Sequence, residues 1–422
     1  MPLILFAYEF GGGLGHLNRL VSVAKALKRE AQFVFALPRP QIGLATLAQT
    51  FGGQARVVSG AFWPGPSSLV QARKVPTETL ADVFMLFGFD RAELLVKATA
   101  TWRRIVDTIR PDLIVVDFAP SLRLAMAHSI PTVVVGNGYT VPPPGMPLPP
   151  LRPWRHVVPA RSRMHEAGLL EAVNAFRARA NGPAIDFFSD LFQGEHTNVC
   201  SFPEFDPYRR YRSQPQIPPF NIPDIRPGPP IADRRDYGIF AYIPSNHPAL
   251  GTVIEALGSI SEPSELYVGD RIPNDLRNRT PSSMRLRSEP VDYNAILPRA
   301  KLLLHHGGLG TAYAGLMAGV PQIMLPLSLE HLITARQTEK LGISLTLPAP
   351  QADGDPARIR GALERVLTDS AIHSAAARTA RNFEQRAQGN GAHVVAGACE
   401  SMLLESAHST ARAPKNVVQE DA

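Results

Sequence analysis

The stretch that decides the fold is "HHGGLGTAYAGLMAGVPQIMLPLSLEHL", residues 305–332. It follows the apolar run "AKLLL", and its pattern predicts a buried strand, a glycine-rich turn, a helix of small residues and a second buried strand. Gly319 and Pro321 are typical of the residues that end a helix. Consecutive strand–helix units with apolar strands predict a parallel sheet covered by helices on both faces.

The same alternation occurs in both halves of the chain. The runs "LILFAY", "AQFVFAL", "PDLIVVD" and "PTVVVGN" are predicted strands of the first half, and "DYGIFAYI", "SELYVGD" and "MRLRSEP" precede the quoted stretch in the second. A Pro-rich stretch separates them. We therefore expect an α/β protein of two Rossmann-like parallel-sheet domains facing across a cleft. The predicted divisions are a first domain at 1–215, a linker at 216–232, a second domain at 233–404 and a tail without regular structure at 405–422.

Composition limits the classes of function. The 422 residues are 45% hydrophobic and 19% charged, which is globular, and the net charge of +6 is dispersed, which argues against a nucleic-acid partner. The mild basic balance is compatible with peripheral contact with an anionic membrane. Cys200 and Cys399 form no CxxC pair, so we expect a reducing compartment and neither a disulfide framework nor a zinc site. These features predict a cytoplasmic protein.

The glycine-rich turn of the quoted stretch predicts an anion site. The preceding strand delivers His306 to the carboxyl edge of the sheet, and the glycines let a ligand approach the backbone. The N-terminus of the following helix favours phosphate groups. The next strand ends just before Glu330 and His331. A carboxylate there either stabilises the helix by its charge or accepts hydrogen bonds from sugar hydroxyls. The alternative for the whole turn is a plain strand-to-helix connection with a hydrogen-bonded histidine.

A second glycine-rich turn, "EFGGGLGHLNRL", places His16 at the start of a helix in the first half. The positive end of a helix favours the neutral imidazole, which can act as a general base. Asp117 ends a predicted strand and is a candidate to orient this imidazole. The alternatives are a histidine bonded to its own turn and an aspartate that caps a helix. Neither glycine-rich turn has the G-x-G-x-x-G or Walker lysine pattern, which argues against dinucleotide and P-loop sites.

Taken together, these motifs resemble the inverting glycosyltransferases of GT-B fold, the UDP-glycosyltransferase and macrolide glycosyltransferase superfamily. The resemblance lies in "GGLGHLNRL", in "DLIVVDFAPSLRLAMAHSIPTVVV" and most strongly in residues 291–342, and it is weakest between 140 and 235. It implies that the first domain binds the acceptor and the second domain the nucleotide-sugar. It also implies that His16 deprotonates the acceptor and that Asp117 partners this base. The donor-binding residues that it implies are His306, Gly307, Gly308, Gly310, Thr311, Glu330 and His331, with Asp292 near the nucleobase. Ser245, in the loop "YIPSNHPAL", either contacts the diphosphate or lies in a plain turn.

The function that the resemblance implies is transfer of a sugar, with inversion, from a UDP- or dTDP-sugar to a hydroxyl of a small-molecule or lipid acceptor. No metal and no cofactor are expected. The sequence departs from the family at Arg19, where members have proline, and at His331, where they have an amide. It also departs at Ala314, where many members have a glutamate, and at Val291 and Asp292, which replace a Pro-Gln pair near the nucleobase. Two alternatives remain open. One is a nucleotide-sugar hydrolase or epimerase of GT-B fold, because "GLGHLNR" also resembles the corresponding turn of those enzymes. The other is a non-catalytic sugar-nucleotide-binding partner.

Overall fold

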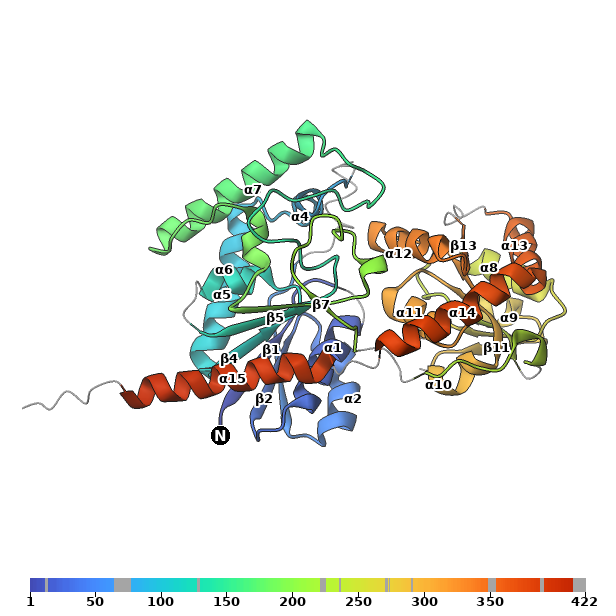
Figure 1. The fold of residues 1–422 in the computed structure, drawn as a ribbon, viewed down its shortest axis with the longest axis horizontal. Coiled ribbons are helices and arrows are strands. Elements are labelled where there is room, and N and C mark those ends of the chain that lie inside the picture. Colours follow the sequence, from blue (N-terminus) through green and yellow to red (C-terminus); the bar gives the residue numbers. More distant parts are fainter. Residues whose placement is uncertain are drawn as a thin grey trace, which may run out of the picture. The chain divides into compact units, whose positions relative to one another are not determined.

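The computed structural model describes residues 1–11, 14–63, 77–126, 130–220, 225–234, 237–269, 272, 274–289, 291–347, 354–387 and 391–412. The chain forms two compact units, one of Met1–Phe220 with Asn390–Ala422 and the other of Asn221–Gly389. Each unit is a parallel sheet with helices on both faces (Figure 1). The predicted fold class, α/β with two parallel-sheet domains, is confirmed.

The first unit contains a seven-stranded parallel sheet in the order β3-β2-β1-β4-β5-β6-β7. The strands are β1 (Leu3–Ala7), β2 (Gln32–Leu37), β3 (Ala55–Ser59), β4 (Leu113–Val116), β5 (Thr132–Gly136), β6 (His196–Cys200) and β7 (Gln216–Ile217). The strand order reverses between β1 and β4, so the connections after these two strands leave toward opposite faces of the sheet. Such a switch point is where open α/β sheets bind ligands, beyond the carboxyl ends of the strands.

Alternate residues of β1 show how helices cover both faces of this sheet. Ile4 and Phe6 pack with α1 (Gly15–Ala26), α2 (Pro40–Phe51) and α15 (Gly391–Arg412). Leu5 and Ala7 pack with α4 (Leu80–Phe87), α5 (Ala92–Ile109), α6 (Pro120–Met126) and α7 (Ala160–Arg179). Because both faces are covered, β4 and β5 are buried along their whole length, which explains their continuous apolar sequences.

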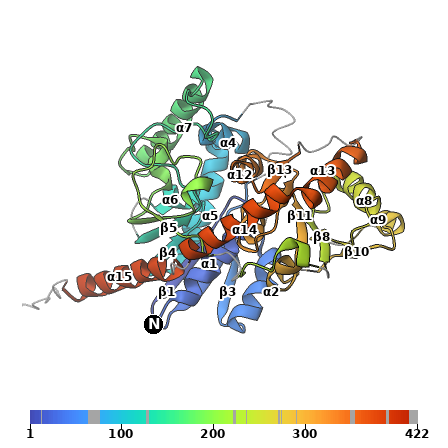
Figure 2. The same ribbon diagram turned by 45° about the vertical axis from the view of Figure 1, so that its right-hand side comes forward.

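Helix α15 belongs to the first unit, although the sequence analysis assigned its residues up to 404 to the second domain. It packs against α1, β4, β5 and β6, and Figures 1 and 2 show it along this sheet. Its buried positions, Val395, Cys399, Met402 and Leu403, recur at helical spacing. That spacing predicts an apolar stripe but not which sheet covers it. The helix also continues to Arg412, into the predicted tail, and residues 413–422 lie outside the described part of the chain.

The second unit contains a six-stranded parallel sheet in the order β10-β9-β8-β11-β12-β13. The strands are β8 (Tyr237–Tyr242), β9 (Ser264–Tyr267), β10 (Met284–Arg287), β11 (Ala300–His305), β12 (Gln322–Met324) and β13 (Ser344–Thr346). Helices α8 (Leu250–Gly258) and α13 (Pro356–Thr368) pack on one face. Helices α11 (Leu309–Met317), α12 (Leu329–Lys340) and α14 (Ser370–Ala387) pack against one another on the other. The switch point of this sheet lies between β8 and β11.

The predicted linker at 216–232 begins inside the first unit. Residues Gln216–Ile217 form β7, which pairs with β6 at the edge of the sheet. Prolines directly after it, at Pro218 and Pro219, supply no backbone N–H and keep this strand short. Residues 221–224 are outside the described ranges. In the part of the chain that the structure covers, none of the helices combines the length and the apolarity needed to cross a membrane.

Candidate active site

His16 and Asp117 lie at the switch point of the first sheet. Helix α1 begins at Gly15 in the connection after β1, which puts His16 in its first turn. Asp117 directly follows β4, and its N–H donates a hydrogen bond of 2.9 Å to the carbonyl of Ala7 at the end of β1. The two side chains meet there, with 3.0 Å between Nδ1 of His16 and Oδ2 of Asp117. A buried carboxylate at this position can orient an imidazole and stabilise its protonated form.

The ring of His16 is held between two aromatic rings. Tyr8 stacks on it with 5.4 Å between ring centroids, and Phe118 lies nearly parallel to it at 6.3 Å. Gly11 closes one side with φ +115, and a Cβ at this position would be 2.5 Å from Cδ2 of His16, so only glycine fits. The His16 side chain nevertheless remains 18% exposed. It is therefore fixed in orientation and still reachable by a substrate.

The backbone beside the carboxylate is strained. Phe118 has φ 56, which is the left-handed region that bulky side chains avoid. Such a residue costs about 1–3 kcal/mol and persists where the surrounding packing determines it. Here Phe118 packs against Phe10, Phe84 and Phe192 and contacts His16. The strain lies directly after Asp117, at the residue that links the carboxylate to the aromatic core.

Asp117 is fully buried and has a second neighbour, Arg19, that the sequence analysis did not connect with it. Nη1 of Arg19 donates a hydrogen bond to Oδ2 of Asp117, the same oxygen that faces His16. Burial alone would raise the pKa of Asp117, but the charge of Arg19 and the contact with His16 outweigh it, and the pKa lies below its ordinary value. Arg19 follows His16 by three positions on α1, a spacing that places both side chains on the same face of the helix.

His306 and His331 lie together at the switch point of the second sheet. His306 follows β11, and its ring is 4.8 Å from the ring of His331, which lies in the first turn of α12. Tyr242, the last residue of β8, contacts His306 edge-on at 5.0 Å and was not predicted as a site residue. Gly307 has φ +93, and a Cβ here would be 3.0 Å from the carbonyl oxygen of His331. The close approach of the two turns therefore requires glycine.

The histidines of this cluster are neutral at pH 7. Burial lowers the pKa of His306 to about 4 and that of His331 to about 3. Each neutral ring can donate one hydrogen bond and accept another. His305 has a different role, because its Nε2 lies 2.9 Å from Oε1 of Gln322 and its Nδ1 accepts from the N–H of Gly307. It is completely buried and holds the turn in place.

The glycine-rich turn leads into α11 as the sequence predicts, with Gly308 as the N-cap. The first N–H groups of a helix have no partner within the helix, so they are available to an anion. No atom lies within 4 Å of where a Cβ of Gly310 would be, which leaves space at this end of α11. Thr311 is 8% exposed, and its Oγ1 is 3.4 Å from the hydroxyl of Tyr293.

The remaining predicted donor residues are held by local backbone structure. The N–H of Ser245 donates to the carbonyl of Val268 at 3.0 Å, in the connection after β8. Asp292 caps the short helix α10 (Tyr293–Ile296), and its Oδ1 accepts from the N–H of Asn294 at 2.9 Å. Glu330 lies in the first turn of α12, where its charge favours the helix.

The sequence is similar to those of known proteins. Residues 260–402 match the family described as the erythromycin biosynthesis protein CIII-like C-terminal domain. The elloramycin glycosyltransferase ElmGT of Streptomyces olivaceus is 26% identical over 363 residues, which cover 80% of this chain and 85% of that protein. The 3-alpha-mycarosylerythronolide B desosaminyl transferase of Saccharopolyspora erythraea is 35% identical over 112 residues. That match spans 26% of this chain and only 25% of that relative.

Solved structures show the same fold. The glycosyltransferase of kitacinnamycin superposes with a TM-score of 0.65 at 18% identity, over 95% of this chain and 99% of that one. The glycosyltransferase VinC in complex with dTDP gives 0.63 at 17% identity, over 96% of this chain and 100% of that one. In sequence and in fold, the chain is thus similar to macrolide and other antibiotic glycosyltransferases of GT-B fold.

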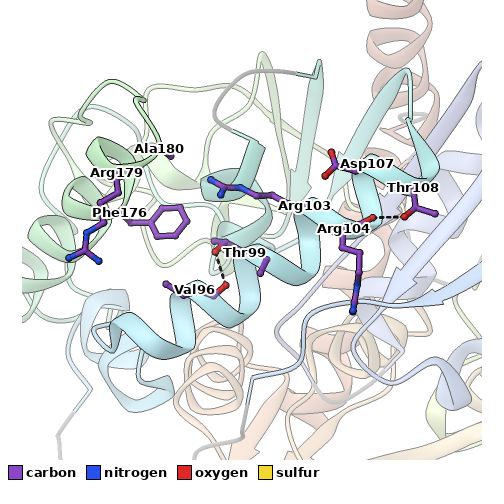
Figure 3. Close-up of a pocket in the computed structure, with 10 residues that line it drawn as sticks. Val96, Thr99, Arg103, Arg104, Asp107, Thr108, Phe176, Arg179 and Ala180 are labelled. Atoms are coloured by element: carbon purple, nitrogen blue, oxygen red, sulfur yellow. Dashed lines mark hydrogen bonds between the residues drawn. The ribbon is translucent and has the colours of Figure 1, made fainter.

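Two further features of this glycosyltransferase concern sites outside the switch points. Among the residues that the structure describes, no group of three or more His, Cys, Asp or Glu side chains could hold a metal ion. A cavity of about 600 Å³ lies between α5 and α7, where the guanidinium of Arg103 is 5.4 Å from the ring of Phe176 (Figure 3). None of the predicted site residues lines this cavity.

Proposed function

We propose that this glycosyltransferase moves a sugar, with inversion, from a dTDP- or UDP-sugar to a hydroxyl of a small-molecule acceptor. The observation that carries the proposal is the distance of 3.0 Å between His16 and the buried, ionised Asp117 at a switch point. A small-molecule acceptor is favoured over a lipid because the desosaminyl transferase is named for 3-alpha-mycarosylerythronolide B. A dTDP-sugar is the first donor to test because VinC holds dTDP.

In the proposed reaction, His16 removes the proton of the acceptor hydroxyl. The acceptor oxygen forms a bond to the anomeric carbon of the sugar from the side opposite the diphosphate. The bond between that carbon and the diphosphate oxygen breaks, and its electron pair leaves with the nucleoside diphosphate. Asp117 stabilises the imidazolium that forms on His16, as the aspartate does in a Ser-His-Asp triad.

The second unit would bind the donor. His306, Thr311 and the free N–H groups of α11 are hydrogen-bond donors for the departing diphosphate, whose charge they stabilise without reorganisation. We propose that these donors make a divalent metal unnecessary. Glu330 and His331 would bind sugar hydroxyls. Ser245 would add a contact to the diphosphate, and the second carboxylate oxygen of Asp292 would face the nucleobase.

The test is turnover of dTDP- and UDP-hexoses with a panel of phenolic and macrolactone acceptors, with and without EDTA. His16→Ala should lower kcat by about 10²–10⁴-fold, the usual contribution of a general base. His196→Ala, at an exposed histidine on β6 of the same unit, is the matched control and should retain full activity. Unchanged turnover in His16→Ala refutes the catalytic assignment. Free sugar formed at the same rate without acceptor would support a hydrolase instead, and loss of turnover in EDTA would contradict metal independence.

A further inference from the structure

One oxygen of the buried Asp117 carboxylate faces both the guanidinium of Arg19 and the imidazole of His16. Oδ2 accepts the hydrogen bond from Arg19 and lies 3.0 Å from Nδ1 of His16. Within the described residues, Oδ1 of Asp117 has no hydrogen-bond partner. We propose that Arg19 is a positioning residue whose positive charge partly compensates the negative charge of Asp117. It thereby limits how strongly the carboxylate holds a proton on His16. This inference rests on the proposed role of His16 as the base.

The position of Arg19 supports this role. Its side chain is 6% exposed and leaves α1 on the same face as His16, so the guanidinium, the carboxylate and the imidazole form one compact group. A guanidinium stays protonated throughout the working pH range, so its charge at Asp117 is permanent. The charge on His16, in contrast, appears and disappears with each proton transfer. A permanent cation therefore keeps Asp117 ionised when His16 is neutral.

The other groups around His16 do not supply this charge. From β1, Tyr8 stacks on the ring, and burial raises its pKa, so it is neutral. From β6, Cys200 lies near Arg19 and Asp117, and burial raises its pKa to about 12, so it is neutral too. Arg39, the N-cap of α2, carries a positive charge that lowers the pKa of Tyr8 but does not outweigh the effect of burial. Phe118 covers the other face of the ring. Among the described residues, the ionised groups at this site are thus Asp117, Arg19 and, farther out, Arg39.

The charge balance has a consequence for the base. With Arg19 removed, the whole carboxylate charge would act on His16 and favour its protonated form, which cannot accept the proton of an acceptor. With Arg19 present, the carboxylate still orients the ring but holds the proton less firmly. Arg19 thus weakens the attraction between the carboxylate and the proton that His16 accepts.

The experiment is an NMR titration of His16 in the full-length, ligand-free protein, with the resonance assigned from His16→Ala. In Arg19→Met the midpoint of the His16 titration should rise by about one pH unit, because a neighbouring positive charge is lost. The acid limb of the kcat/KM profile should move upward equally. Arg19→Lys keeps a charge at Asp117 and should restore the wild-type midpoint. Should Arg19→Met fail to fold, Arg19→Gln removes the same charge and is expected to give the same rise.

Arg123→Met is the matched control. Arg123 is a buried arginine on α6 of the same unit, but its Nε donates to the carbonyl of Gln193 and it faces Glu195. Its loss should leave the His16 midpoint unchanged. An unchanged or lowered midpoint in Arg19→Met or Arg19→Gln overturns the inference even if His16→Ala is inactive. A raised midpoint together with full activity of His16→Ala would uphold the electrostatic coupling and refute the proposed function.

Discussion

Replacing Asp117 by asparagine tests the electrostatic part of the proposed mechanism. Asparagine keeps the shape of the side chain but removes its charge. Two unit charges 3.0 Å apart, the separation of His16 Nδ1 and Asp117 Oδ2, attract by about 5.5 kcal/mol at an effective dielectric of about 20. Arg19 shares the same oxygen, so His16 receives only part of this energy. We expect a loss of about 3–5 kcal/mol of transition-state stabilisation, which is a fall in kcat/KM of about 10²–10⁴-fold.

The assay must separate this loss from unfolding. Asp117→Asn leaves the buried Arg19 without its carboxylate, and breaking a buried pair from one side costs about 3–5 kcal/mol of stability. Initial rates are therefore measured well below the melting temperature of the variant, at saturating donor, with circular dichroism as the check of folding. The double variant Asp117→Asn with Arg19→Met should recover stability without recovering turnover. A folded Asp117→Asn enzyme that retains kcat/KM within about threefold of wild type would refute the reasoning.

Three further predictions follow from individual residues. Gly11→Ala should lower turnover by about 10²-fold in a folded protein, since the new Cβ would displace the His16 ring, and wild-type turnover would contradict this. In thermal-shift assays, dTDP at 100 times its Kd should stabilise the wild type by about 2.7 kcal/mol. The control variant His373→Ala should show the same stabilisation, and His306→Ala should show much less. Equal shifts in all three proteins would exclude His306 from the diphosphate site. Burial raises the pKa of Glu9 from 4.5 to about 7, so the proton is held more tightly in the folded state, and the free energy of unfolding should fall by about 3 kcal/mol as pH rises through this range. Denaturant titrations of Glu9→Gln should lack this decline; an unchanged decline assigns it to other groups.

Much of the sheet architecture could be predicted from the sequence because the central strands are buried on both faces. The continuous apolar runs at β1, β4, β5 and β11 reflect that burial. The edge strands of the first sheet were not predicted, since β3 is only partly buried and β7 is two residues long. Helix α7 was not predicted, although Leu169, Val173 and Phe176 follow helical spacing and Leu169 and Val173 are fully buried.

The positions of the candidate site residues could be predicted where they belong to a glycine-rich turn. Contacts that depend on tertiary packing could not. The glycine-rich turns located His16 and His306 at the carboxyl edges of their sheets, because helix starts and glycines are visible in the sequence. The meeting of Arg19 with Asp117 is not visible in this way, since the two residues are 98 positions apart and adjacent only in the folded sheet. Likewise, Tyr242 reaches His306 only because β8 and β11 pair.

Helix α15 has a consequence for engineering. Because the segment from 391 to 412 covers a face of the β4–β6 region, the first unit is assembled from both ends of the polypeptide. A fragment that stops at residue 220 would expose the apolar strip under Val395, Cys399 and Met402 and should aggregate. Chimaeras that exchange the first unit between enzymes of this kind therefore need two junctions, one near 220 and one near 390, with both terminal pieces taken from the same parent.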